Sequence, residues 1–194
     1  MALEKNSALS MGRVGNVGTH SFAVGDNVYA EGESSHAEGY NTDASGDFSH
    51  AEGVSTIASE KTSHAEGMLS EAKAEAAHAE GTNTIASGES SHAEGSYTTA
   101  SGIASHAEGK KNKATNNFAH AEGSFNTASG NSSHAEGFTT EASGMYSHAE
   151  GEVTLAKGTG SHAEGFETIA KGNYSHAEGT TTEASGEGSH AEGY

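Results

Sequence analysis

The chain of 194 residues carries 27 acidic against 9 basic side chains, a formal net charge of −18 at pH 7, and has 27 glycines, 13 histidines and no cysteine. This acidic balance argues against binding to nucleic acid, which depends on clustered lysine and arginine, and the absence of cysteine excludes disulfides and thiolate metal sites. No apolar run approaches the length of a membrane span, so we expect no membrane insertion by this segment. Low hydrophobicity with high charge is typical of disorder, but this sequence is periodic.

The periodic element is a 14-residue repeat. His-Ala-Glu-Gly occurs in twelve copies at this step, ten preceded by serine and two by Ala77 and Ala119. Midway between copies stands a second motif, Thr-x-Ala-Ser-Gly, as in Thr42–Gly46. Glycine about every seventh residue would break a helix, whereas two strands of about five residues joined by two-residue corners fit the repeat. We therefore predict an all-β solenoid with two short strands per 14-residue coil, in which corner glycines supply positive φ.

In chain order, residues 1–7 are predicted to cap the solenoid or to fray, and residues 8–34 to form its opening coils. Alternation along a strand places Ser35 and Ala37 on one face and His36 and Glu38 on the other. A flattened coil of two strands has room inside only for small side chains. We therefore expect serine, alanine and threonine to fill the lumen, and each histidine and glutamate to point outward.

The opening coils indicate what the outward face contacts. In the repeat frame, Phe22 takes the place of the histidine and Val24 that of the glutamate, and one coil earlier, at a step of 13, Leu9 and Met11 take these places. Four large apolar residues in outward positions predict a buried stripe. Because the lumen is already filled, we infer that another chain covers this stripe.

Residues 35–194 are predicted to form twelve repeats of the same solenoid. Other outward positions vary, as Asp43, Ile57 and Lys113 do, whereas the histidine and the glutamate stay constant. A solvated face would not need that uniformity. The predicted polar stripe consists of His36, Glu38, His50, Glu52, His64, Glu66, His78, Glu80, His92, Glu94, His106, Glu108, His120, Glu122, His134, Glu136, His148, Glu150, His162, Glu164, His176, Glu178, His190 and Glu192.

The pattern Ser-x-Ala-x-Gly followed by Thr-x-Ala-x-Gly at a period of 14 resembles the head domain of trimeric autotransporter adhesins of the Yersinia adhesin type, over roughly residues 8–194. The His-Glu variant is also similar to repeats in tail-fibre and appendage-like proteins of Gram-positive phages and prophages. The resemblance implies a left-handed parallel β-roll, with three chains packed about a threefold axis. It places the polar stripe, together with Leu9, Met11, Phe22 and Val24, in the trimer core, and it implies an extracellular location on a bacterial surface or a virion.

The stripe allows two chemical interpretations. In the first, each glutamate accepts a hydrogen bond from a histidine of its own or a neighbouring chain, which satisfies both side chains. If such pairs were ionised, the histidine pKa would rise and the glutamate pKa would fall on folding. In the second, three imidazoles on a threefold axis bind zinc or nickel in some layers. We favour the first interpretation and expect no metal and no cofactor.

The repeat suggests two further functions, catalysis by a serine-histidine-glutamate triad and binding of a receptor or glycan. Serine, histidine and glutamate occur together in most copies, but parity puts Ser35 and His36 on opposite faces, which argues against a catalytic triad; we expect no enzyme. A receptor or glycan on a host surface would contact the variable corners. The corners carry aromatic residues that either bind such a ligand or cover neighbouring coils: Tyr40, Phe48, Tyr97, Phe118, Phe125, Phe138, Tyr146, Phe166 and Tyr174.

The predicted protein is therefore a homotrimeric fibrous segment, the head or shaft of a bacterial surface adhesin or of a phage tail fibre, with a polar His-Glu core. The alternatives are a receptor- or glycan-binding adhesin that uses the corner aromatics, and a metal-binding histidine-rich rod.

Overall fold

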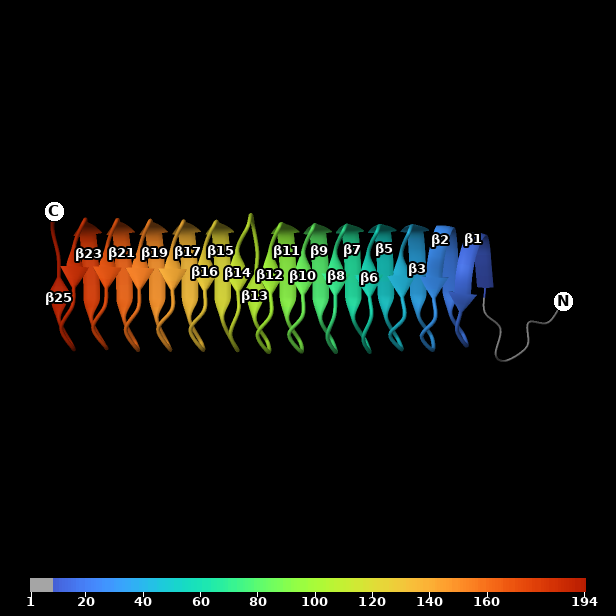
Figure 1. The fold of residues 1–194 in the computed structure, drawn as a ribbon, viewed down its shortest axis with the longest axis horizontal. Coiled ribbons are helices and arrows are strands. Elements are labelled where there is room, and N and C mark those ends of the chain that lie inside the picture. The colour runs from blue at the N-terminus through green and yellow to red at the C-terminus, as the bar shows by residue number, and fades with distance from the viewer. Residues whose placement is uncertain (1–8) are drawn as a thin grey trace. The chain divides into compact units, whose positions relative to one another are not determined.

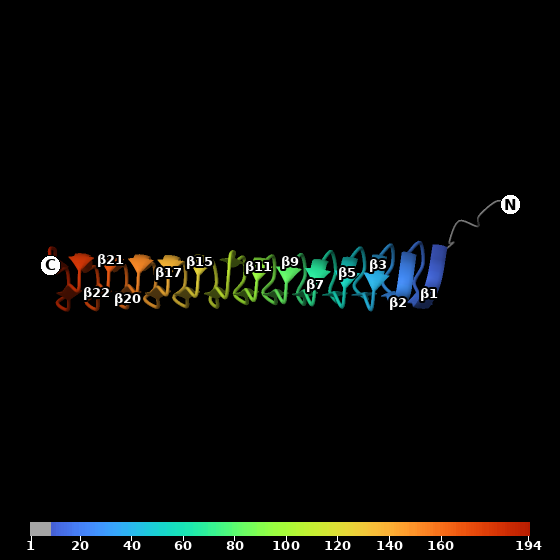
Figure 2. The same cartoon turned by 90° about the horizontal axis from the view of Figure 1, so that it is seen from above.

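The computed structural model describes the backbone of residues 9–194 and the side chains of residues 15–194, so the predicted cap at residues 1–7 lies outside the described residues. The chain divides into two compact units, residues 1–95 and residues 96–194. Within each unit the strands pair in parallel from coil to coil, as in a β-solenoid (Figures 1 and 2). Residues 9–194 contain no helix long and apolar enough to cross a membrane.

The first unit stacks long strands on one sheet and short strands on the other. His36 lies opposite His50 and Ala37 opposite Ala51, which confirms the 14-residue step. The long strands are β1 (Leu9–Val17), β2 (Phe22–Ala30), β3 (His36–Tyr40), β5 (His50–Val54), β7 (His64–Met68), β9 (His78–Thr82) and β11 (His92–Ser96). The short strands are β4 (Asp43–Ala44), β6 (Ile57–Ala58), β8 (Glu71–Ala72) and β10 (Ile85–Ala86).

The second unit repeats this arrangement. Its long-strand sheet contains β13 (His106–Ala107), β15 (His120–Ser124), β17 (His134–Phe138), β19 (His148–Glu152), β21 (His162–Phe166), β23 (His176–Thr180) and β25 (His190–Ala191). Its short strands are β12 (Thr99–Ala100), β14 (Lys113–Ala114), β16 (Thr127–Ala128), β18 (Glu141–Ala142), β20 (Leu155–Ala156), β22 (Ile169–Ala170) and β24 (Glu183–Ala184). Strand β13 is shorter than β15, and beyond it only Lys110 bridges to Ser124.

Small side chains fill the lumen, as parity predicts. The motif alanines Ala37 and Ala135 are fully buried, and so is the second-motif alanine Ala128. Ser35 is 2% exposed and Thr42 is fully buried, so the polar lumen residues share the same interior. A lumen lined by alanine, serine and threonine brings the two sheets close together, and it leaves the larger side chains outside.

The second strand of each coil is shorter than predicted, with two residues rather than five. The reason is a four-residue turn that leads into the next long strand. In one such turn the Ser147 N–H donates to the Gly144 carbonyl at 3.2 Å, and the Ser147 hydroxyl donates to the same carbonyl at 2.7 Å. Ser133 and Gly130 make the same hydroxyl bond at 2.7 Å. The repeated serine before each histidine is thus a turn-closing residue as well as a lumen residue.

The prediction that corner glycines supply positive φ is confirmed for the glycine after each motif glutamate and is wrong at the other corner. In the turns before the long strands, positive φ falls on non-glycine residues such as Phe48 at 59° and Tyr146 at 58°. The glycine two residues earlier is needed for close stacking, because a Cβ at Gly144 would lie 2.0 Å from the Gly158 carbonyl oxygen. Gly137, which follows a motif glutamate, combines positive φ with close stacking: its φ is 105°, and an added Cβ would lie 2.2 Å from the Gly151 carbonyl oxygen.

Candidate functional site: the histidine-glutamate stripe

The histidines and glutamates lie on the outer face of the long-strand sheet, where the sequence places them. The His64 and Glu66 side chains are 34% and 47% exposed in the single chain, whereas Ala65 between them is fully buried. The strand register sets each histidine beside the equivalent histidine of the next coil, and each glutamate beside the equivalent glutamate. These two parallel columns are called the stripe below. Their role as a trimer core stays a prediction, because the structure is that of one chain.

The imidazole rings stack face to face. Ring centroids lie 4.6–4.7 Å apart from His36 to His92, with interplanar angles of at most 12°. From His106 to His176 the separation is 4.7–4.8 Å and the angle at most 6°. A spacing of about 4.8 Å is that of paired strands, so the sheet itself imposes the ring separation.

The apolar residues of the opening coils continue the stripe. The Phe22 ring packs edge-on against His36 with centroids 5.0 Å apart, and Val24 is in register with Glu38. Leu9 and Met11 are in backbone register with Phe22 and Val24, which confirms the predicted step of 13, but their side chains lie outside the described ones. Phe22 and Val24 are half-buried in the single chain.

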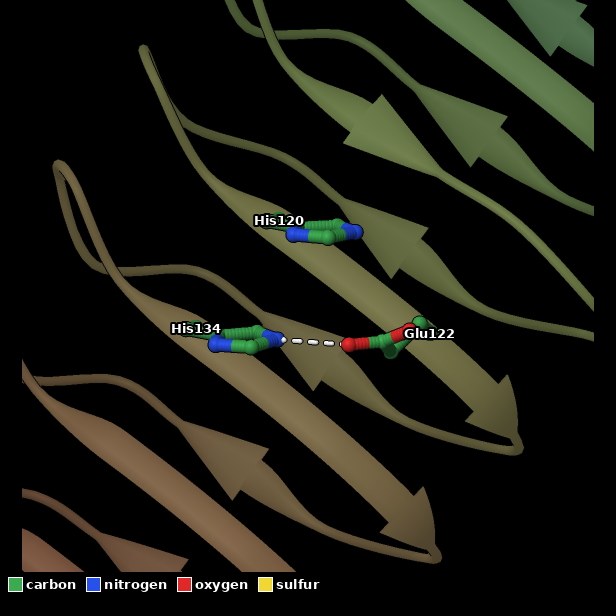
Figure 3. A group of neighbouring side chains, drawn as sticks. All are labelled: His120, Glu122 and His134. Carbon is green, nitrogen blue, oxygen red and sulfur yellow. Dashed lines mark hydrogen bonds and ion pairs between the residues drawn. The ribbon is translucent and has the colours of Figure 1, made fainter.

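The contacts between histidine and glutamate differ between the two units. In the first unit the contacts within 4.0 Å join a histidine and a glutamate of one strand, such as His50 Nε2 and Glu52 Oε2 at 3.7 Å. In the second unit histidines also reach the glutamate of the preceding coil. His134 Nε2 lies 3.1 Å from Glu122 Oε1 and forms a hydrogen bond with it, while the stacked His120 ring lies above (Figure 3). The cross-coil contact recurs between His176 and Glu164 at 3.6 Å.

Most of these contacts are longer than a hydrogen bond. The Nε2 atoms of His50, His64 and His120 are buried and have no hydrogen-bond partner among residues 15–194. A buried polar atom without a partner is destabilising and rare in folded proteins. The stripe of a single chain therefore has unmet hydrogen-bonding capacity.

The histidine pKa values shift against the expectation for ionised pairs. Burial first, and the neighbouring imidazole His36 second, lower the pKa of His50 below its usual 6.5, although glutamates oppose the shift. Burial also lowers the pKa of His120 and His148, again with neighbouring histidines as the next cause. Burial disfavours the charged imidazole, and the stacked neighbouring histidines add repulsion between charged rings, so the neutral form is favoured.

Neighbouring glutamates share protons in the second unit. Hydrogen bonds that the protonated Glu150 donates to the carboxylates of Glu164 and Glu136 raise the pKa of Glu150 to about 7. The bond to Glu150 holds the pKa of Glu136 and of Glu164 below the usual value. A protonated glutamate alternating with ionised neighbours reduces the negative charge that the formal count assigns to the stripe.

A groove of about 980 Å³ runs beside the glutamate column of the second unit. It exists because the residue after each glutamate is glycine, so no side chain stands next to the carboxyl group. The groove is lined by Glu136, Gly137, Glu150, Gly151, Glu164, Gly165, Glu178, Gly179, Glu192 and Gly193.

The stripe of one chain does not converge on a metal ion. The donor atoms of His120, Glu122 and His134 lie within 4.8 Å of one another. Zinc bonds to nitrogen at about 2.0–2.1 Å, which in a tetrahedral site sets donors roughly 3.4 Å apart. The parallel His120 and His134 rings, with centroids 4.7 Å apart, would have to tilt toward each other.

The serine of the motif is not placed to act with the adjacent histidine. Ser133 is 1% exposed and its hydroxyl donates to the Gly130 carbonyl, whereas the His134 ring lies on the outer face. This placement confirms the predicted facing of the two side chains on opposite sides of the strand.

Two lumen asparagines were not anticipated from the sequence. Asn112 and Asn126 replace the usual threonine and are fully buried. The Asn126 N–H donates to Asn112 Oδ1 at 2.7 Å, and the Asn126 side-chain amide donates to the Gly137 carbonyl at 2.8 Å. Both asparagines lie near the shortened strand β13. The sequence feature that could have predicted their hydrogen bonds is the amide side chain in a position that usually holds threonine.

The corner aromatics Tyr40 and Phe166 are exposed, and Lys111 lies beside the corner residue Phe125. Tyr40 is 56% exposed and Phe166 40%. Lys111 Nζ lies 4.9 Å above the Phe125 ring.

No protein-family model matches the chain, and no curated protein matches it either.

Proposed function

We propose that this chain is a segment of a homotrimeric surface fibre, the head or shaft of a bacterial adhesin or of a phage tail fibre, in which three copies pack through the stripe. The observation that carries the proposal is the continuity of the stripe. Phe22 and Val24 occupy the same outward columns as the histidines and glutamates. Apolar side chains in an outward column favour cover by another chain.

The polar part of the stripe supports the same arrangement. The Nε2 atoms of His64 and His120, which lack a hydrogen-bond partner among residues 15–194, would gain acceptors from carboxylates of a neighbouring copy. The groove beside Glu150 and Gly151 has room for side chains of that copy. A network that satisfies every member fixes register as well as adding stability.

The proposed fibre has the left-handed coil and threefold axis implied by the resemblance to adhesin heads, and it lies outside the cell or on a virion. Its role is structural: parallel coils stacked by repeated hydrogen bonds extend a rigid surface without a large core in any one chain. The metal-binding alternative is not favoured, because the donors of one chain do not converge.

Sedimentation equilibrium tests the proposal. We expect three times the mass of one chain, and a monomeric mass would overturn it. The double variant Phe22→Asp and Val24→Asp places charge in the apolar part of the stripe and should weaken the trimer. Ile57→Asp, which lies on the short-strand sheet, is the matched control and should leave the mass unchanged.

A further inference from the structure

A row of aromatic side chains lies on one edge of the second unit, away from the stripe. Phe118, Tyr146 and Tyr174 occupy the same position of the four-residue turn before a long strand and are 60%, 62% and 68% exposed. These turns follow one another along one edge of the unit (Figure 1). The three residues are called the aromatic row below.

The aromatic row occupies every second coil. Ser132 and Gly160 hold the same turn position in the coils between, and both are half-buried. Successive coils are 4.7–4.8 Å apart, as the stacked histidine rings show, so the aromatic residues recur at roughly 9.6 Å. This alternation leaves a gap between neighbouring aromatic side chains.

The turn backbone holds these residues rigidly. Their φ angles are 57°, 58° and 56°, and their N–H groups donate to the preceding coil at 2.7–2.9 Å. The Tyr174 ring lies against Gly160, where an added Cβ would be 2.9 Å from Cδ1. Rigid exposed rings lose little entropy when a flat ligand stacks on them.

The residue directly before each aromatic side chain of the row is uncharged, while Lys157 and Lys171 directly precede two of the turns. The residue before each of these turn positions, in successive coils, is Ile103, Asn117, Asn131, Met145, Thr159, Asn173 and, in the last coil, the charged Glu187. In the first unit the equivalent residues are all charged: Glu33, Asp47, Lys61, Glu75 and Glu89. The first unit also has only one aromatic residue in the row position, Phe48.

Two amides stand beside the rings as hydrogen-bond donors. Asn117 Oδ1 accepts from the Ile103 N–H, and Asn173 Oδ1 accepts from the Thr159 N–H, each at 3.0 Å. These bonds fix the orientation of both side-chain amides. Aromatic faces with adjacent amide donors suit a ligand that has flat apolar faces and hydroxyl acceptors.

We propose that the aromatic row binds an extended, neutral β-1,4-linked polysaccharide lying along the turns. Alternate sugars in such a chain present the same face, so one sugar in two stacks on a ring, and the aromatic repeat is close to the length of a disaccharide unit. The residues directly before the three rings are uncharged, and a chain of net charge −18 repels anionic polymers. This site is separate from the stripe, so its failure and that of the proposed trimer are distinguishable.

Calorimetric titration of the full chain with chitohexaose and cellohexaose tests the proposal. At least one should bind, and maltohexaose, an α-linked chain of different shape, should bind at least tenfold more weakly. Alanine at Phe118, Tyr146 and Tyr174 together should weaken binding by at least tenfold, whereas Phe48→Ala should change it less than twofold. Failure of both β-linked hexasaccharides to bind, or equal loss with Phe48→Ala, would overturn the proposal.

A second variant separates spacing from simple apolar attraction. The pair Ser132→Tyr and Tyr146→Ala keeps three aromatic residues but breaks their regular step, at a position whose φ of 53° matches that of Tyr146. It should bind as weakly as the triple alanine variant, while its circular dichroism and melting temperature stay close to those of the unaltered chain. Unchanged affinity in this variant would show that the step does not matter and would sink the inference.

Discussion

His134 Nε2 donates to Glu122 Oε1 of the preceding coil at 3.1 Å, while the stacked His120 ring lies 4.7 Å away. The stripe therefore joins successive coils in two ways, through stacked rings and through contacts between imidazole and carboxyl groups. Both follow from the strand register, which brings identical residues into line. Identical titratable groups in line also repel one another when charged, and the pH response should reflect this.

We predict that the chain loses stability as the pH falls below about 6.5. Burial and neighbouring histidines lower the folded pKa of His50, His64 and His78 below 6.5. The unfolded chain then binds more protons, so the stabilisation is present above pH 6.5 and is lost as the pH falls toward the folded values. Thermal melting between pH 8 and 5 measures this loss of stability as a fall in the melting temperature.

His64→Gln should reduce that pH dependence, because it removes one titrating ring from the column. His20→Gln, which removes a histidine outside the stripe, is the control. A melting temperature that rises on acidification through this range would contradict the assignment of lowered histidine pKa values.

The stability that Glu150 contributes should depend on pH in the opposite direction to that of the histidines. Its pKa of about 7 in the folded chain lies above the usual 4.5, so its contribution is fully present below pH 4.5 and is lost as the pH rises through about 7. Glu150→Gln keeps a hydrogen-bond donor and removes the charge. It should raise the melting temperature by a few °C at pH 8.5 and change it little at pH 5. Glu141→Gln, on the other sheet, should show no such difference between the two pH values, and an equal effect of both variants would argue against shared protons.

The narrow lumen should reject a larger side chain. Ala128 is fully buried in β16, and Ala128→Leu should cost about 1–3 kcal/mol through overpacking. Thr127→Leu, one residue earlier, should cost about 0.5 kcal/mol or less, because Leu155 and Ile169 already occupy the equivalent outward position. Denaturant unfolding of both variants compares them, and equal costs would mean that the lumen is not tightly packed.

A methyl group at Gly137 should be destabilising. Its φ of 105° disfavours any other residue by about 1–3 kcal/mol, and a Cβ would lie 2.2 Å from the Gly151 oxygen. Gly186→Ala is the matched control, since the nearest atom to an added Cβ is 3.5 Å away. Thermal melting should separate the two variants clearly, and similar melting temperatures would show that the backbones can move apart.

Cysteine cross-linking tests the association of chains through the stripe. The chain has no cysteine of its own, so Glu122→Cys places one thiol on the stripe and Glu141→Cys one on the other sheet. A short bis-maleimide should link chains through Glu122→Cys and leave Glu141→Cys monomeric on a denaturing gel. Linkage of both variants to the same extent would indicate random collision rather than a stripe interface.

The sequence allowed the coil and the facing of its residues to be predicted closely. Strict alternation around Ala37 and a constant 14-residue step sufficed to assign lumen and outer face, and the structure confirms both. The short second strand was not predictable from the motif, because the serine before each histidine was assigned only to the lumen. Its second role, closing a turn with glycine, depends on backbone geometry.

The sequence by itself determined the 14-residue period and the outward position of His120, Glu122 and His134, because side-chain direction in a strand depends only on parity. Only the tertiary structure decided how these residues interact. Stacking at the strand spacing sets the imidazoles against one another and lowers their pKa values, which the motif alone could not indicate. The aromatic row also depends on the fold. Its residues are 28 positions apart in the sequence, and only the solenoid aligns them along one edge, separated by two coils.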